Sequence, residues 1–320
     1  MNWNPLSAVL STIYGGIVGA RNVLYDHRWL RSGSLQGPVI SVGNLSVGGS
    51  GKTPFVILLG ELLKARGVNF DVLSRGYGRA TRGVMLVDPG GLPRDFGDEP
   101  LLIARRLQAP VVVGEDRYEA GRFAEARFGA QIHLLDDGFQ HRGLARDFDI
   151  VLVTPDDARD RLLPGGRLRE SLRSLQRADA VVLTSGASAE SFPVAGKIVW
   201  RVRRGIDPQN VPARPVAFCG IARPQNFLLQ LRTAGIDPVA EAFFRDHHAY
   251  TEKDVNDLLQ LQRQSEAGGF VTTEKDAVNL GVYLAALKPL AVVPVKMELA
   301  DAANAVDTMM RMIEERQRRS

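Results

Sequence analysis

A glycine-rich stretch that ends in lysine and threonine has the residue types and spacing that bind phosphate groups. Small side chains let backbone N–H groups turn toward phosphate oxygens, and a following helix N-terminus adds partial positive charge. We expect Lys52 to reach the β- and γ-phosphates of a nucleotide and the Thr53 hydroxyl to ligate Mg²⁺. The stretch predicts nucleoside triphosphate binding without specifying the reaction, and its residues are Ser46 (where the general pattern has glycine), Val47, Gly48, Gly49, Ser50, Gly51, Lys52 and Thr53.

Two adjacent aspartates follow an apolar run further along the chain. Asp136 and Asp137 come directly after Leu134 and Leu135, where a buried strand is expected to end. Mg²⁺ prefers oxygen ligands and keeps several waters, so one direct and one water-mediated carboxylate would suffice. An aspartate pair in a loop is commonly only a turn, but the upstream phosphate loop favours a metal site. The sequence does not say which aspartate contacts the ion.

Further polar groups lie in loops that could face the same site. Asp98, in FGDEP, either begins a helix, where a carboxylate is favourable, or acts as base for an attacking hydroxyl. In DHHAYT, adjacent histidines are more often surface residues, although across a cleft His247 could pair with a carboxylate, with His248 as the adjacent alternative. Residues 74–79 and 162–171 are glycine- and arginine-rich loops expected at the carboxyl edge of the sheet, where ligands bind.

These loops supply candidates whose roles the sequence leaves open. Arg167 and Arg169 could neutralise phosphate charge or be solvated loop residues, and Glu170 could join the metal ligands. His141 and Arg142 are either polar loop residues or substrate contacts. The candidate contacts to the phosphate acceptor are Arg75, Gln140, His141, Arg142 and Arg169.

Apolar runs alternate with helical patterns along the chain and predict an α/β fold. Residues 39–42 predict a strand, 53–66 a helix, and five further strands are expected before Ser185. Near-continuous apolar strands that alternate with helices imply a parallel sheet covered on both faces, like that of phosphate-loop NTPases. We expect residues 31–200 to form this domain, 205–288 a smaller α/β domain across a cleft, and 289–320 a return strand and a closing helix.

The remaining part, residues 1–30, is expected to be a helix at a membrane surface. Residues 5–20 are uncharged but fall short of the roughly 17–25 residues that span a bilayer, and no secretory signal is expected. The segment predicts either a helix packed on the protein's own core or one that lies on a membrane without crossing it. Residues that suit a membrane–water boundary are Trp3, Arg21, Tyr25, Arg28, Trp29 and Arg31.

Composition excludes some classes of protein. The apolar fraction of 45% and the charged fraction of 24% are ordinary for a globular chain of 320 residues, and with a net charge of only +4 no nucleic-acid partner is expected. Cys219 is the only cysteine, which excludes an intrachain disulfide and a thiolate zinc site and fits a reducing compartment.

The rest of the chain must choose among phosphate-loop functions. A GTPase would need a D-x-x-G metal motif and an N-K-x-D guanine reader, but Asp136–Gly138 has the wrong spacing and TEKD (273–276) lacks the asparagine. A lipid or small-molecule kinase needs a phosphate loop, metal carboxylates, a base and an acceptor cleft, and each has candidates here. An ATPase or GTPase switch, or a chaperone without lipid phosphorylation, is the alternative.

Seven motifs, in this order, resemble those of tetraacyldisaccharide 4'-kinase of lipid A biosynthesis. They are SVGNLSVGGSGKTP, SRGYGR, GDEP, LDDGFQHR, LLPGGRLRE, DHHAYT and VTTEKDAV, and they run from Ser41 to Val278. The serine-led phosphate loop together with LDDGFQHR is specific to that family, which shows serine at the position of Ser46.

The resemblance implies a peripheral enzyme on the cytoplasmic face of the inner membrane of a Gram-negative bacterium. It would transfer the γ-phosphate of ATP, with Mg²⁺, to the 4'-hydroxyl of a lipid-linked glucosamine disaccharide 1-phosphate to give lipid IVA, without an obligate protein partner. Two α/β domains joined by a two-stranded linker are also implied. Carried over by motif, the site would use Lys52 and Thr53 for phosphates and Mg²⁺, Asp136 and Asp137 for the metal, Asp98 as base and His247, or alternatively His248, as its assistant.

Overall fold

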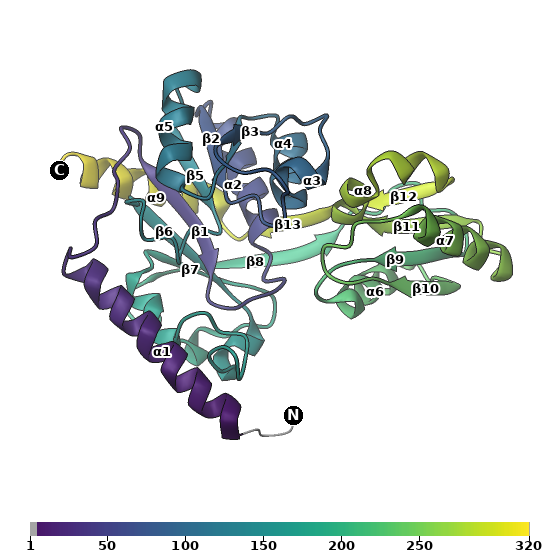
Figure 1. Cartoon of the computed structure of the whole chain (residues 1–320), viewed down its shortest axis with the longest axis horizontal. Helices are drawn as coiled ribbons and strands as arrows, with labels where there is room; N and C mark the ends of the chain where they lie inside the picture. The colour runs from purple at the N-terminus through teal and green to yellow at the C-terminus, as the bar shows by residue number, and fades with distance from the viewer. Residues whose placement is uncertain (1–4, 320) are drawn as a thin grey trace.

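The computed structural model describes residues 5–319, in which two β-sheets of different size lie side by side (Figure 1). In order across the larger sheet, the strands are β13 (Val295–Leu299), β8 (Ile198–Ile206), β7 (Ala180–Leu183), β6 (Phe148–Val153), β1 (Val39–Asn44), β5 (Ile132–Asp136), β2 (Phe70–Ser74), β4 (Val111–Val113) and β3 (Met85–Leu86). In order across the smaller sheet they are β10 (Ala240–Phe243), β9 (Pro215–Cys219), β11 (Gly269–Thr273) and β12 (Leu290–Val293). We call each sheet with its helices the large lobe and the small lobe.

The central strands of the large lobe are parallel and buried on both faces, which confirms the predicted α/β class. β1 pairs with β5 on one side and β6 on the other, and the register places Val42 beside Asp136. The ends of β1 and β5 therefore lie together at one edge of the sheet. The phosphate loop leaves β1 at that same edge.

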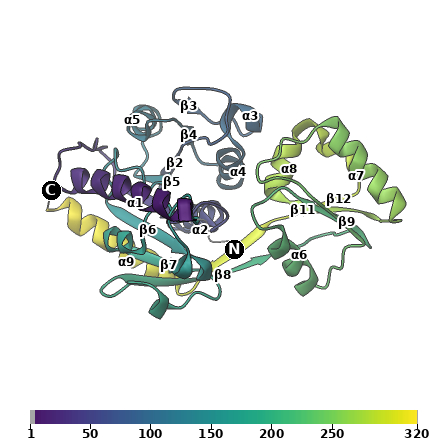
Figure 2. The same cartoon turned by 60° about the horizontal axis from the view of Figure 1, so that its bottom comes forward.

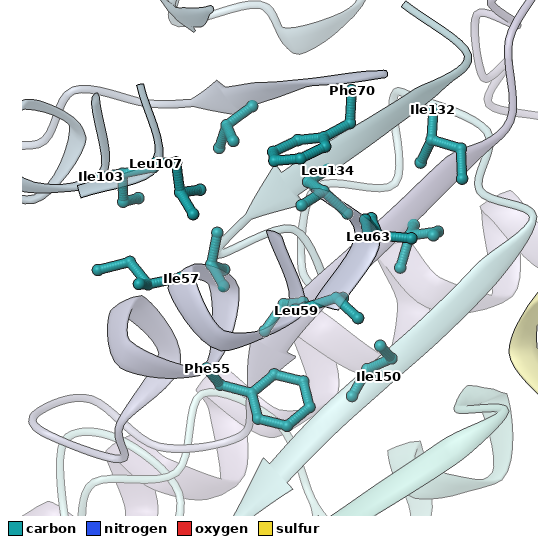
Figure 3. Packing of buried hydrophobic residues seen from close by; sticks show 14 of the residues in the cluster. Phe55, Ile57, Leu59, Leu63, Phe70, Ile103, Leu107, Ile132, Leu134 and Ile150 are labelled. Atoms are coloured by element: carbon teal, nitrogen blue, oxygen red, sulfur yellow. The ribbon is translucent and has the colours of Figure 1, made fainter. Parts of the chain in front are cut away.

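Helices cover both faces of the larger sheet. On one face lie α2 (Lys52–Ala65), α4 (Asp98–Leu107) with the short α3 (Pro93–Phe96), and α9 (Ala302–Gln317); the other is covered by α5 (Arg117–Phe128) and a segment with the 3₁₀ turns η1 (Pro155–Arg159), η2 (Leu172–Arg177) and η3 (Ala189–Ser191). Figure 3 shows Phe55, Leu59 and Leu63 of α2 packed among buried residues of the neighbouring strands, including Leu134 and Ile150. Burial contributes roughly 1.5–3 kcal/mol per large apolar side chain, so this layer fixes the helix that follows the phosphate loop.

The small lobe repeats the same arrangement with four parallel strands. α6 (Pro224–Thr233) covers one face, and α7 (Glu252–Gln264), α8 (Glu274–Leu280) and the turn η4 (Gly281–Ala286) cover the other. Phe218 and Phe270 meet edge to face at 6.2 Å in its core.

The chain passes between the lobes in β8 and again in β13. These strands pair antiparallel, from Val202–Leu299 to Ile206–Val295, and extend from one lobe toward the other (Figures 1 and 2). The return strand expected at residues 289–299 is two strands, because Pro294 has no N–H for a ladder and separates β12 from β13. β12 completes the smaller sheet whereas α9 packs on the larger one, so residues 289–320 are shared between the lobes.

α1 (Pro5–Asp26) runs along the outside of the large lobe (Figure 2). Hydrogen bonds attach it to the lobe: Ser11 Oγ donates to Leu162 O at 2.9 Å, and Tyr14 OH donates to Arg169 O at 3.1 Å. The opposite face is apolar and exposed at Leu6, Val9, Leu10, Ile13, Ile17 and Val23. The apolar side chains are therefore not buried in the core. Among residues 5–319, none of the helices combines the length and the continuous apolar character that spanning a bilayer requires, and Trp3 lies outside the described residues.

Candidate active site

A cavity of about 840 Å³ lies between the two lobes. The large lobe lines it with the phosphate loop (residues 46–53), Arg75, Tyr77, Asp98, Glu99, Asp136, Asp137 and Arg169. The small lobe lines it with residues that include Ile221, Ala222, Phe227, Asp246, His247 and Lys275. Most residues predicted for the site from the sequence are thus brought together, and Glu170, Gln140, His141 and Arg142 are not among the lining residues.

The phosphate loop has the backbone shape that its glycines allow. Gly48 and Gly51 have φ of 94° and 90°, a region that side chains with a Cβ rarely adopt, and Gly51 is the N-cap of α2. The Ser50 side chain is buried, and its Oγ has no hydrogen-bond partner. The first N–H groups of an α-helix have no partner within the helix, so α2 begins with donors at the cavity wall. This arrangement suits an anion with several oxygens.

Lys52 reaches from the start of α2 to the ends of β1 and β5. Its Nζ donates to Asn44 Oδ1 at 3.1 Å and lies 3.6 Å from Asp137 Oδ1. Asp137 also accepts two hydrogen bonds from the Arg169 guanidinium, at 2.9 and 2.8 Å. Burial acts to raise the pKa of Asp137, but the two cations outweigh it and hold that pKa below its usual range. Asp137 is therefore a fixed negative charge.

Asp136 has the opposite electrostatic environment. Its Oδ2 accepts a hydrogen bond from Ser74 Oγ at 3.1 Å, whereas its buried Oδ1 has no partner. Burial, with the charges of Glu99 and Asp137 nearby, raises the pKa of Asp136 to about 7. A divalent cation beside this carboxylate would reverse that effect, and Oδ1, which has no hydrogen-bond partner, could then coordinate the ion.

The residues present fit Mg²⁺, although not with all the ligands expected from the sequence. Thr53, Asp136 and Asp137 line one part of the cavity and offer a hydroxyl and two carboxylates, and a protein site for Mg²⁺ needs no more because the ion keeps its waters. Within residues 5–319 no group of three or more His, Cys, Asp or Glu side chains is arranged to hold a metal. Glu170 is not brought to the others, because its buried carboxylate accepts hydrogen bonds from Arg177, Asn22 and Ser174, at 2.9, 2.8 and 2.9 Å.

Asp98 begins α4 and also faces the cavity, so it has both features that the sequence left open. Its Oδ1 accepts from the Glu99 N–H at 2.9 Å. Its other partners come from the small lobe: His247 Nδ1 lies 2.8 Å and Asn279 Nδ2 3.1 Å from Oδ2, with Lys275 Nζ at 3.7 Å. Burial acts to raise the pKa of Asp98, but His247 and Lys275 outweigh it and the pKa lies below its usual value. The carboxylate is therefore ionised and able to accept a proton.

The two adjacent histidines have different surroundings. His247 has φ of 100°, and this backbone turn aims its ring at Asp98. His248 points elsewhere: its Nε2 lies 3.0 Å from Asp254 Oδ2, and its ring stacks on Phe244 at 4.8 Å. Of the two, His247 is the one that meets the carboxylate.

The predicted contacts to the phosphate acceptor fall into two groups. Arg75 and Arg169 line the cavity. The others lie between the cavity and α1: the Gln140 side chain donates to Asn44 O at 2.9 Å, and Arg142 pairs with Asp26 at 2.7 Å. His141 is beside them, and burial with Arg117 nearby lowers its pKa to about 4.

Comparison with known proteins shows the family to which the chain belongs. The sequence model of the family described as tetraacyldisaccharide-1-P 4'-kinase (LpxK) matches residues 3–314. The chain belongs to this family. It is 52% identical over 324 aligned positions to a tetraacyldisaccharide 4'-kinase of Koribacter versatilis, covering 98% of this chain and 99% of that protein. A tetraacyldisaccharide 4'-kinase of Chlorobaculum tepidum is 40% identical over 83% of each chain. The structure of Aquifex aeolicus LpxK in complex with ATP matches with a TM-score of 0.79 and 34% identity, over 96% of this chain and 98% of that one.

The sequence did not predict three of the polar residues that contact Lys52 or Asp98 in this family member. Asn44 ends β1 and holds Lys52, while Lys275 and Asn279 lie on α8 and face Asp98. A signal for Lys275 was present, because it follows the apolar strand at 269–273 and the carboxyl ends of parallel strands gather ligand-binding groups. Asn279 lies four residues further, on the same face of the helix.

Proposed function

We propose that this chain is a lipid kinase that transfers the γ-phosphate of ATP to the 4'-hydroxyl of a tetraacyldisaccharide 1-phosphate, giving lipid IVA. The observation that carries the proposal is the placement of Asp98, ionised and paired with His247, in the same cavity as the phosphate loop and the Asp136–Asp137 pair. An ATPase or GTPase switch needs to position only water, whereas this cavity also offers a base and room for an acceptor.

The nucleotide end of the cavity would hold ATP on the phosphate loop, with Lys52 at its β- and γ-phosphates. Ile221 and Phe227 of the small lobe would provide apolar surface for the adenine base of ATP. Thr53, Asp136 and Asp137 would hold Mg²⁺, which when bound neutralises charge on the phosphate oxygens. The orphaned Asp136 Oδ1 and the Ser50 hydroxyl without a partner support this assignment. Arg169 and Arg75 would add further positive charge beside the phosphates.

At the acceptor end, Asp98 would accept the proton of the sugar hydroxyl as that oxygen attacks phosphorus. His247 orients the carboxylate, and Lys275 keeps the local charge balanced. A sugar hydroxyl is a weak nucleophile, so positioning and charge neutralisation would supply most of the acceleration. Two lobes, approximately residues 31–200 and 205–288, would each contribute part of this site.

The lipid part of the substrate would be met at a membrane surface. Each buried methylene contributes roughly 0.8 kcal/mol, so a four-chain lipid does not leave a bilayer readily. α1 presents an apolar exposed face and is followed by the exposed Trp29, with Arg28 and Arg31 beside it. We propose that this helix lies on the cytoplasmic face of the inner membrane and that Gln140, His141 and Arg142, directly beneath it, contact the headgroup.

Phosphate transfer from labelled ATP to purified tetraacyldisaccharide 1-phosphate in detergent micelles tests the function. Label in the lipid that depends on Mg²⁺ is the expected result. Label released only as free phosphate would make the chain an ATPase and overturn the proposal. Lys52→Ala serves as the control that the observed transfer uses this cavity.

A further inference from the structure

One largely buried ammonium group lies within 4 Å of the proposed base and of two titratable groups beside it. Lys275, the second residue of α8, places Nζ 2.8 Å from Asp246 Oδ1, 3.1 Å from His247 Nε2 and 3.7 Å from Asp98 Oδ2. Its side chain is only 17% exposed. Burial acts to lower the pKa of Lys275, but Asp98, Glu99 and Asp246 outweigh it, so the pKa lies above its usual value and the group stays charged.

The contact with His247 defines where the imidazole proton is. An ammonium group has three donors and no acceptor, so a hydrogen bond between Lys275 Nζ and His247 Nε2 requires Nε2 to accept. The single proton of the neutral ring is then on Nδ1, 2.8 Å from Asp98 Oδ2, where it donates. On this side of the ring Lys275 favours that tautomer, whereas Asp246, whose Oδ1 lies 3.7 Å from Nε2, favours a proton on Nε2.

We propose that Lys275 is a positioning residue for phosphoryl transfer: it holds His247 as the neutral tautomer whose Nδ1–H donates to Asp98, and so keeps Asp98 an oriented anion. The inference rests on the proposed function, because Asp98 is the base proposed there. Lys275 itself does not touch the reacting atoms in this account. It acts through His247 and through its charge.

The groups facing His247 come from several elements, and their charges oppose one another. Asp98 and Glu99 approach from α4, Asp246 from the adjacent loop position, Lys275 from α8, and the Tyr77 ring at 5.7 Å from the loop after β2. The hydrogen bond to Asp98 raises the pKa of His247, and the charge of Lys275 opposes that rise. Removing Lys275 should therefore favour protonation of both His247 and Asp98.

The scaffold behind Lys275 is rigid enough for this role. The neighbouring Asp276 is fully buried and accepts hydrogen bonds from the Gly220 N–H at 2.7 Å and from Tyr250 OH at 2.8 Å. Gly220 O in turn accepts from the His247 N–H at 3.4 Å. The start of α8 and the loop that carries His247 are thus tied together within the small lobe, so Lys275 and His247 reach Asp98 as one unit.

The first test is the pH dependence of lipid phosphorylation by the full chain and three variants. Lys275→Met should lower kcat by at least about tenfold, less than the roughly 10²–10⁴ of a general base because Lys275 acts through His247, with a smaller change in KM for ATP. The acidic limb of its kcat profile should move to higher pH. Lys275→Arg keeps the charge and should restore the limb toward the wild-type position. Arg106→Met breaks another contact between the lobes, the 2.8 Å pair with Glu274, and should leave the limb in place.

The second test reads the tautomer without using activity. In full-length protein labelled with ¹⁵N-histidine, the His247 signals are assigned by their loss in His247→Gln. At alkaline pH the wild type should show Nδ1 protonated and Nε2 as an acceptor, and Lys275→Met should populate the Nε2–H form. A wild-type ring protonated at Nε2 overturns the proposal even if Lys275→Met does not fold.

The outcomes separate this inference from the proposed function. If the wild type transfers phosphate but Lys275→Met keeps the wild-type limb and tautomer, only the role of Lys275 is overturned. If Lys275→Met and Arg106→Met lose kcat equally and neither shifts the acidic limb, Lys275 only helps to hold the lobes together. That result likewise overturns the role proposed for Lys275. A wild type that phosphorylates no lipid overturns the proposed function, and the tautomer measurement still reports on Lys275.

Discussion

His247 Nδ1 lies 2.8 Å from Asp98 Oδ2, although the residues are 149 positions apart and belong to different lobes. Asp98 is only 5% exposed at the start of α4, and His247 has a backbone φ of 100°. A non-glycine residue in such a conformation costs on the order of 1–3 kcal/mol, which the surrounding contacts must offset. Neither lobe alone contains the paired base, so the site exists only where the lobes meet.

Asp98→Asn should lower kcat by about 10²–10⁴, the usual contribution of a general base, while KM for ATP changes little. Asparagine keeps the size of the side chain and can still accept from the Glu99 N–H, so α4 should begin normally. Asp95→Asn, in the neighbouring α3, is the matched control because Asp95 pairs with the exposed Arg94. Steady-state kinetics with the lipid acceptor decide. Loss of ATP affinity with kcat preserved would instead indicate that Asp98 only begins the helix.

Replacing Ile13 and Ile17 together by glutamine should weaken binding to vesicles that contain anionic lipid by at least about tenfold, because each buried isoleucine contributes roughly 1.5–3 kcal/mol. Both side chains are exposed, at 54% and 65%, and glutamine is compatible with a helix, so stability should change little. Val282→Gln, at an even more exposed apolar position on the small lobe, is the control. Vesicle co-sedimentation measures the effect, and equal binding by all three proteins would contradict a membrane role for α1.

Much of the large lobe could be predicted because its information is local. The apolar strands, the phosphate loop and the aspartate pair each lie within a short segment, and the carboxyl-edge rule for parallel strands brings them together. The partners of Asp98 could not be worked out this way. Which histidine reaches it depends on how one lobe sits on the other, so the sequence could suggest His247 as a partner for a carboxylate but left His248 as the alternative.

One difference from the expectations, at Glu170, and one outcome that the sequence left open, at the N-terminal helix, have specific physical causes. Glu170 follows a predicted phosphate-binding arginine directly, but Arg177, seven residues later, turns back through η2 and neutralises its carboxylate. The N-terminal helix carries apolar residues like a core helix, yet Ser11, Tyr14 and Asn22 hold it to the lobe, so its apolar face is left outside. Contacts between such distant segments set both outcomes.

Gly43→Ala should lower the free energy of unfolding by about 1–3 kcal/mol. It should also raise the Mg²⁺ concentration needed for half-maximal kcat. A Cβ at Gly43 would lie 2.5 Å from Phe139 Cβ and 2.9 Å from the Phe139 backbone N, and Phe139 is fully buried two residues after Asp137. Strand β1 or the aspartate loop must therefore shift. Gly19→Ala is the control, since a Cβ there meets no atom within 4 Å. Denaturant unfolding and a Mg²⁺ titration of kcat measure the two effects. A Gly43→Ala protein with the stability and Mg²⁺ response of the wild type would contradict the prediction.

Stability should fall as pH decreases from about 6.5 toward 4, partly because of His141. Burial lowers the pKa of this ring to about 4 in the folded protein, whereas an unfolded chain has about 6.5. Between those values the unfolded state binds more protons, so its population rises as pH falls; above pH 6.5 both states are neutral and the effect is absent. At pH 5 the cost is about 2 kcal/mol. His141→Asn should remove this part of the decline between pH 7.5 and 5, and His27→Asn, an exposed histidine changed in the same way, should retain it. Chemical denaturation at the two pH values measures the difference, and a His141→Asn protein that loses as much stability as the wild type would show that the ring is protonated without cost in the folded state.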